Sequence, residues 1–95
     1  MADLKFDWDE AKNKANQRKH GVSFEEAQTV FFDGHALQFF DDDVLGEDCF
    51  LMLGCSSKLR TLVVVHCFRD EESVIRIISA RKPTTKERTE YLEES

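Results

Sequence analysis

One histidine and three arginines stand in segments that otherwise carry apolar strand residues. His66 interrupts a run of valines, Arg76 interrupts a run of valine and isoleucine, and Arg69 and Arg81 lie in the same two segments. An imidazole can transfer a proton, and guanidinium groups bind phosphate. Metal-free RNA cleavage needs a base for the 2′-hydroxyl, cations for the charged phosphorane and an acid for the leaving oxygen. The pattern therefore predicts a phosphate-handling site.

The predicted hairpin between these segments sets their geometry. If residues 70–72 form the turn, Arg69 pairs with Ser73, and His66 then lies opposite Arg76 on one face of the sheet. An alternative is that His66 is a hydrogen-bonded core residue and that Arg76 pairs with a helix carboxylate or reaches the sheet edge. Spacing alone leaves both interpretations open.

Two helices are predicted before the strands. Asp7 is a candidate N-cap for the first, with Glu10 three residues later. Trp8, Ala11 and Ala15 recur at helical spacing and are expected to face the core. A polar stripe borders them, made of Lys12, Asn16 and Lys19. Lys12 and Lys19 could join the phosphate site if this helix overhangs it.

The segment 19–26 ends one helix and begins another. Gly21 can take the left-handed conformation that terminates a helix, and Ser23 with Glu26 forms a capping box for the next. The second helix is predicted from Ser23 to about Phe32. Its buried face is expected to be Phe24, Ala27, Val30 and Phe31.

From residue 35 onward the period changes to that of strands. The predicted strands cover residues 36–40, 49–55, 61–69 and 74–81. Their short connections favour an antiparallel meander, and the acidic segment 41–48 is expected to be a hairpin loop. That loop could bind a cation, but its spacing matches no EF-hand, so a solvated tip or a docking site for a basic partner is favoured.

The chain closes with a third helix. Pro83 ends the sheet, and Thr84 with Glu87 predicts a capping box for a helix that carries Tyr91 and Leu92. Tyr91 could stack on a base, with packing as the simpler role. We therefore expect one α+β domain over residues 1–95, with two N-terminal helices, a four-stranded antiparallel meander sheet and a C-terminal helix.

Charge and cysteine content restrict the function. The net charge is −6, yet Lys and Arg are confined to the segments before Gly21 and after Ser57, so a fold that joins the two ends would gather a basic face. Cys49, Cys55 and Cys67 form no CxxC and are interpreted as small buried side chains in a reducing compartment, neither disulfide-bonded nor zinc-binding. No cofactor motif, signal peptide or membrane-length apolar run occurs, so we expect a soluble cytoplasmic protein.

The set of motifs resembles one known family. The blocks that carry the resemblance are residues 6–12, Asn16, residues 19–27, residues 63–66, Arg69, residues 75–81, Glu87 and Tyr91. They are similar to the BrnT toxins of bacterial type II toxin–antitoxin systems. The resemblance implies a RelE-like fold, a ribonuclease that inhibits translation, and neutralisation by a BrnA-type antitoxin whose ribbon-helix-helix part binds operator DNA.

The resemblance also implies site residues. It transfers catalytic roles to His66, Arg69, Arg76 and Arg81, and substrate contacts to Lys12, Lys19 and Tyr91, with Lys82 following Arg81.

Cys49 stands where such sequences often have an arginine, which makes weakened activity conceivable. The alternative is thus a catalytically weakened or inactive homologue that acts as a protein-interaction module, which binds the antitoxin as a co-repressor. A DNA-binding module is disfavoured by the acidic start of the second helix.

Overall fold

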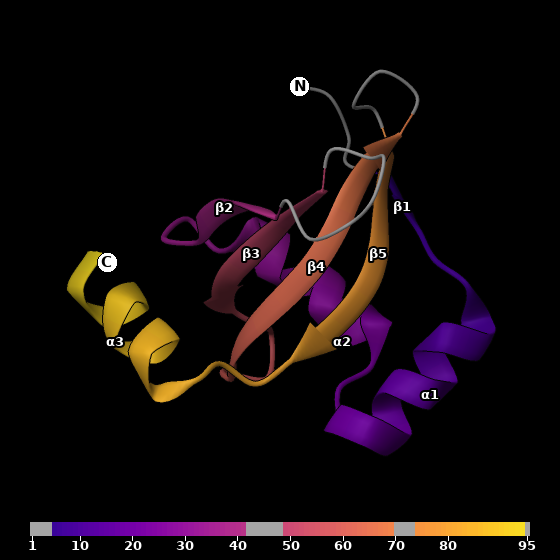
Figure 1. The fold of residues 1–95 in the computed structure, drawn as a ribbon, viewed down its shortest axis with the longest axis horizontal. Coiled ribbons are helices and arrows are strands. Elements are labelled where there is room, and N and C mark those ends of the chain that lie inside the picture. The colour runs from indigo at the N-terminus through magenta and orange to yellow at the C-terminus, as the bar shows by residue number, and fades with distance from the viewer. Residues whose placement is uncertain (1–4, 42–48, 70–73, 95) are drawn as a thin grey trace.

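The structure, a computed structural model, describes residues 5–41, 49–69 and 74–94. Its elements are β1 (Lys5–Asp7), α1 (Glu10–His20), α2 (Phe24–Ala27), the 3₁₀ helix η1 (Gln28–Phe32), β2 (Leu37–Asp41), β3 (Cys49–Cys55), β4 (Thr61–Arg69), β5 (Val74–Arg81) and α3 (Thr85–Glu94). In Figure 1, α2 lies behind the sheet, α1 lies beyond β5, and α3 lies beyond β3.

The described strands form a five-stranded mixed sheet in the order β1-β5-β4-β3-β2. The antiparallel pairings from β2 to β5 confirm the meander. The predicted four-stranded antiparallel sheet is nevertheless wrong, because β1 adds a strand parallel to β5, with Lys5 opposite Val74 and Asp7 opposite Arg76. A three-residue strand is too short to show a strand period, and its partner lies far along the chain, so no local signal predicts this pairing.

The predicted strand ends agree closely with the structure. β3, β4 and β5 have the expected bounds, and β2 begins one residue later than expected. Asp41, predicted to begin the acidic loop, ends β2 instead. The rest of the predicted loop and the predicted turn at 70–72 lie outside the described residues.

The core lies between the sheet and the α2–η1 segment. It contains Val22, Phe24, Ala27, Val30, Leu62, Val64, Ile77 and Ala80. The second predicted helix is a short α-helix that continues as a 3₁₀ helix. Ser23 caps it as expected, since its hydroxyl accepts from the Glu26 amide at 3.1 Å. The Glu26 carboxylate does not complete the capping box, because it instead binds Ser56 and Arg60.

The first helix differs from the prediction at its start. Asp9, two residues later than the expected Asp7, caps α1 by accepting from the amides of Ala11 and Lys12. Asp7 belongs to β1 instead. The helix ends as expected at Gly21, whose φ of 69° is left-handed and whose amide donates to the Gln17 carbonyl.

The buried face of α1 is also polar rather than apolar. Ala11 and Ala15 are exposed, whereas Asn13 and Asn16 are buried. The Asn13 side-chain oxygen accepts from the Phe24 amide at 2.9 Å. Asn16 donates to the Ala80 carbonyl at 2.8 Å and accepts from the Ala80 amide at 3.2 Å. Hydrogen bonds from asparagine side chains to backbone groups thus hold the helix in place, and a search for apolar spacing cannot predict them.

Two further contacts hold the sheet and α3. Cys49 and Cys67 lie opposite each other in β3 and β4 and form a disulfide, so the prediction of free thiols is wrong for this pair. The pairing of β3 with β4 brings these two cysteines together, and the spacing of cysteines in the sequence does not predict that pairing. Thr84 and Glu87 form the predicted capping box, with bonds of 2.8 and 3.2 Å.

No helix in the described ranges is long and apolar enough to cross a membrane.

Candidate functional site

Three arginines share the sheet face that lies away from α2. Side chains alternate along a strand, so Arg69 shares its face with Cys67 and Val63 of β4. Arg76 pairs with Cys67, and Arg81 pairs with Val63. Paired residues point to the same side of the sheet. We call this side, which carries Arg69, Arg76 and Arg81, the arginine face.

A bulge makes this arrangement possible. Arg76 and Arg81 are five positions apart, an odd offset, so in a regular strand they would point to opposite faces. The register between β4 and β5 shifts between Val65 and His66, where His66 pairs with Ile77 and Val65 pairs with Ser79. The extra residue in β5 restores Arg81 to the face of Arg76.

His66 lies on the opposite, core face. The predicted pairing of His66 with Arg76 is wrong: Arg69 pairs with Val74 rather than Ser73, and His66 therefore pairs with Ile77. A shift of one position exchanges the two faces of a strand. The predicted partners are thus separated by the sheet itself.

The surroundings of His66 are aromatic. The side chain is fully buried, with ring centroids 4.7 Å from Phe31, 5.4 Å from Phe68 and 6.1 Å from Phe50. Its Nδ1 lies 3.1 Å from the Val64 carbonyl, which can only accept, so Nδ1 carries the proton. Nε2 has no hydrogen-bond partner among the described residues. Burial lowers the pKa of His66, so the ring is neutral at pH 7.

Asp7 joins two of the arginines across three strands. Its Oδ2 accepts from Arg76 at 2.7 Å and from Arg69 at 3.3 Å. The Arg76 side chain is 28% exposed and that of Arg69 is 54% exposed. A guanidinium has five N–H donors, so each arginine keeps donors for a ligand.

Arg81 is held by the third helix. Its two terminal nitrogens donate to both oxygens of Glu87 at 2.8 and 3.0 Å. These hydrogen bonds lower the pKa of Glu87 to about 2 and raise the pKa of Arg81. A bidentate pair fixes the plane of the guanidinium. The Glu87 predicted only as a capping residue therefore also orients a candidate site residue.

The predicted substrate-binding residues fall in three places. Lys12 and Lys19 line a hollow of about 210 Å³ between α1 and β5, together with Ser79, so α1 does border the arginine face. Lys82 lines a different hollow at the end of the sheet. The Tyr91 hydroxyl donates to Asp33 at 2.6 Å, which ties α3 to the turn before β2 and raises the pKa of Tyr91 to about 12. Tyr91 is thus a structural anchor in this state.

Sequence reasoning missed the role of Asp7, because only the parallel pairing of β1 brings it to Arg76. It also missed Arg60 and Arg88, which join Lys82 in one hollow from distant parts of the chain. Among residues 5–41, 49–69 and 74–94, no group of three or more His, Cys, Asp or Glu side chains could hold a metal ion.

A sequence profile described as "Ribonuclease toxin, BrnT, of type II toxin-antitoxin system" matches residues 8–87. The chain belongs to the BrnT family. BrnT proteins are ribonuclease toxins, so RNA is the target and an antitoxin is the partner. The 1.1 Å crystal structure of the Brucella abortus ribonuclease toxin BrnT has the same fold, with a TM-score of 0.68, 22% sequence identity, 87% of this chain covered and 100% of that chain. No curated protein sequence matches the chain.

Proposed function

We propose that this BrnT-family ribonuclease cleaves RNA on the arginine face without a metal ion. The observation that supports the proposal most is the convergence of Arg69, Arg76 and Arg81 on one face, which the register shift and the bulge produce. Lys12 and Lys19 beside β5 would extend the positive surface along the RNA. Planar guanidinium groups suit the two non-bridging oxygens of a phosphodiester.

The arginines act on the charge that develops during the reaction. The 2′-oxygen attacks phosphorus and its proton passes to water. The P–O5′ bond then breaks, which leaves a 2′,3′-cyclic phosphate, and water protonates the leaving 5′-oxygen. The phosphorane between these steps carries added negative charge, and donors fixed in advance stabilise that charge. Asp7 holds Arg69 and Arg76, and Glu87 holds Arg81, so the guanidinium groups are oriented before RNA binds. Loss of one such donor costs on the order of 10² to 10³ in kcat.

The predicted catalytic role of His66 takes a different form in this proposal. The ring is enclosed by aromatic side chains on the core face, so the proposal gives it a positioning role beneath β4. Acid–base function would require the ring to leave the core. The arginines are therefore the residues assigned to contact RNA.

Cleavage of short RNA oligonucleotides by purified protein in the presence of EDTA tests this proposal. We expect Arg76→Gln to lower kcat by about 100-fold or more, with Arg18→Gln on the exposed side of α1 as the matched control. Unchanged cleavage by folded Arg76→Gln would overturn the site. Abolition of activity by EDTA would overturn metal independence, and no cleavage with antitoxin binding retained would indicate the interaction module.

We also propose that the antitoxin is of the BrnA type and that operator DNA is bound only through its ribbon-helix-helix part. The resemblance of the motifs supports this assignment. Copurification of a small ribbon-helix-helix protein encoded beside this chain, and DNA binding by the complex but not by the toxin, are expected. DNA binding by the isolated toxin would contradict it.

The same resemblance supports a RelE-like classification and a cytoplasmic site of action.

A further inference from the structure

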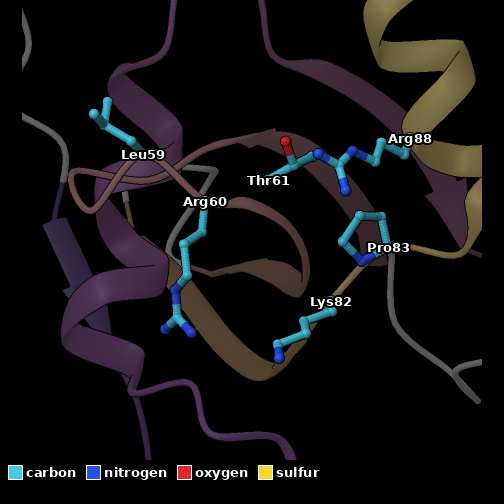
Figure 2. A pocket seen from close by; sticks show the side chains of 6 residues that line it. All are labelled: Leu59, Arg60, Thr61, Lys82, Pro83 and Arg88. Atoms are coloured by element: carbon cyan, nitrogen blue, oxygen red, sulfur yellow. The ribbon is translucent and has the colours of Figure 1, made fainter.

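A second basic site lies at one end of the sheet. The turn before β4 and the linker from β5 to α3 enclose a hollow of about 350 Å³. Figure 2 shows Arg60 and Lys82 extending on one side of Thr61 and Pro83, and Arg88 entering from α3 on the other. A volume of this size equals about a dozen waters at roughly 30 Å³ each. It can therefore admit a hydrated anionic group.

The cations of this pocket differ in how they are neutralised. Arg60 binds the buried Glu26 carboxylate, and this hydrogen bond lowers the pKa of Glu26. Lys82 and Arg88 have no carboxylate within 4.0 Å among the described residues. The arginines of the arginine face, by contrast, all have carboxylate partners. In a chain of net charge −6, two uncompensated cations beside a hollow favour an external anion.

The rim of the pocket has an unusual backbone. Leu59 has φ 61°, the left-handed region, and its side chain is 87% exposed. The tight turn is closed by the Ser56 amide bonding to the Arg60 carbonyl and by the Leu59 amide bonding to the Ser56 carbonyl. A bulky residue in this conformation costs energy and recurs at ligand-binding sites. The turn places Arg60 and Thr61 at the pocket, and the left-handed conformation of Leu59 is the energetic cost of that placement.

We propose that this pocket binds a phosphodiester of the RNA strand outside the cleaved bond, an assignment that rests on the proposed function. Lys82 directly follows Arg81 and lines the pocket, so the pocket lies at the end of β5 that carries Arg81, and an RNA strand that passes Arg81 can extend to it. The five strand positions from Arg76 to Arg81 span roughly 16 Å at about 3.3 Å per residue. Lys82 and Arg88 lie beyond Arg81, at the far end of this span from Arg76, so the pocket is a separate subsite for a flanking nucleotide.

Binding of a fully 2′-O-methylated RNA oligonucleotide with a 5′-hydroxyl end tests the pocket apart from cleavage. This probe contains internal phosphodiesters alone and has no 2′-hydroxyl nucleophile. We expect Lys82→Gln and Arg88→Gln each to weaken binding several-fold and to reduce the slope of log K against log salt by about 0.7. Lys86→Gln, an exposed lysine on the same helix that does not line the pocket, is the control.

The outcomes separate this proposal from the previous one. In cleavage of unmodified RNA, pocket variants should raise KM, whereas Arg76→Gln should lower kcat. Unchanged binding of the methylated probe by the double variant would overturn the pocket, as would weaker antitoxin neutralisation with RNA binding intact. Absence of cleavage by the wild type, with the probe still bound more weakly by the pocket variants, would overturn the proposed function and support the pocket.

Discussion

At the scale of single residues, His66 packs in the core, although its place in the sequence suggested a catalytic role. It fills a space between three phenylalanines and donates from Nδ1 to the Val64 carbonyl. The ring cannot meet a phosphate on the arginine face, because the sheet lies between them. Its identity still matters, since removal would leave a cavity beside β4.

The two substitutions His66→Ala and His66→Leu distinguish packing from catalysis. We expect His66→Ala to lower the free energy of unfolding by about 2–4 kcal/mol, because it opens a cavity in the core. His66→Leu keeps most of the volume and should cost less than about 1.5 kcal/mol. Urea denaturation measures both.

RNA cleavage by the folded His66→Leu variant supplies the second measurement. Activity within tenfold of the wild type is the expected result. A loss comparable to that of Arg76→Gln in a folded protein would assign the imidazole a direct role in the reaction.

At the scale of elements, strand ends were predictable and strand registers were not. Turn residues and apolar alternation are local, so the bounds of β3, β4 and β5 follow from the sequence. The one-position shift at Arg69 and the bulge beside His66 depend on contacts between strands. Each moves side chains across the sheet, which is why the sequence could select the arginines as candidates but could not predict their position relative to His66.

The helix α1 gives a second case. Its buried asparagines recognise backbone groups of β5 and of the segment after α1, and such pairing depends on tertiary distance alone. A search for apolar spacing therefore selects Ala11 and Ala15, which are exposed. The helix positions were predicted, but its orientation was not.

The replacement Asn16→Ala tests this docking. It removes donors to the Val22 and Ala80 carbonyls and an acceptor for the Ala80 amide, all in buried positions. We expect a loss of about 2–3 kcal/mol in the free energy of unfolding, since a buried unsatisfied group costs about 1–3 kcal/mol. The Ala80 amide should also exchange its hydrogen faster. Lys14→Ala on the exposed side of the helix should change stability little, and equal losses for the two variants would contradict this account.

At the scale of the whole molecule, acid should act in two separate ranges of pH. The pKa of His66 is lowered by burial, so the unfolded chain binds a proton that the folded chain excludes. Stability therefore falls as the pH drops below the unfolded value of about 6.5, by up to about 1.4 kcal/mol per pH unit. Glu26 and Glu87 have lowered pKa values, to about 2 for Glu87, so their contribution persists until the pH falls below about 4.5.

The pH dependence of urea unfolding checks this separation. His66→Leu should remove the loss of stability between pH 6.5 and pH 5 and leave the lower range unchanged. Glu87→Gln should reduce the loss below pH 4.5, by about 1–2 kcal/mol after allowance for solvent screening of a partly exposed pair. A wild-type profile that is flat from pH 7 to pH 5 would contradict the neutral state assigned to His66.

The bond between Asn16 and Ala80 also governs how this molecule can meet other chains. In the described residues β1 covers β5 only as far as Arg76, so the rest of its outer side would present free peptide groups. A carboxamide has the donor and acceptor of a peptide, and here it occupies the place of the missing neighbour. Exposed strand edges recruit strands from other molecules. A second chain that extends this sheet must therefore add at an edge strand, β2 or β1, rather than along the rest of β5, and loss of the carboxamide would open a new site for self-association there.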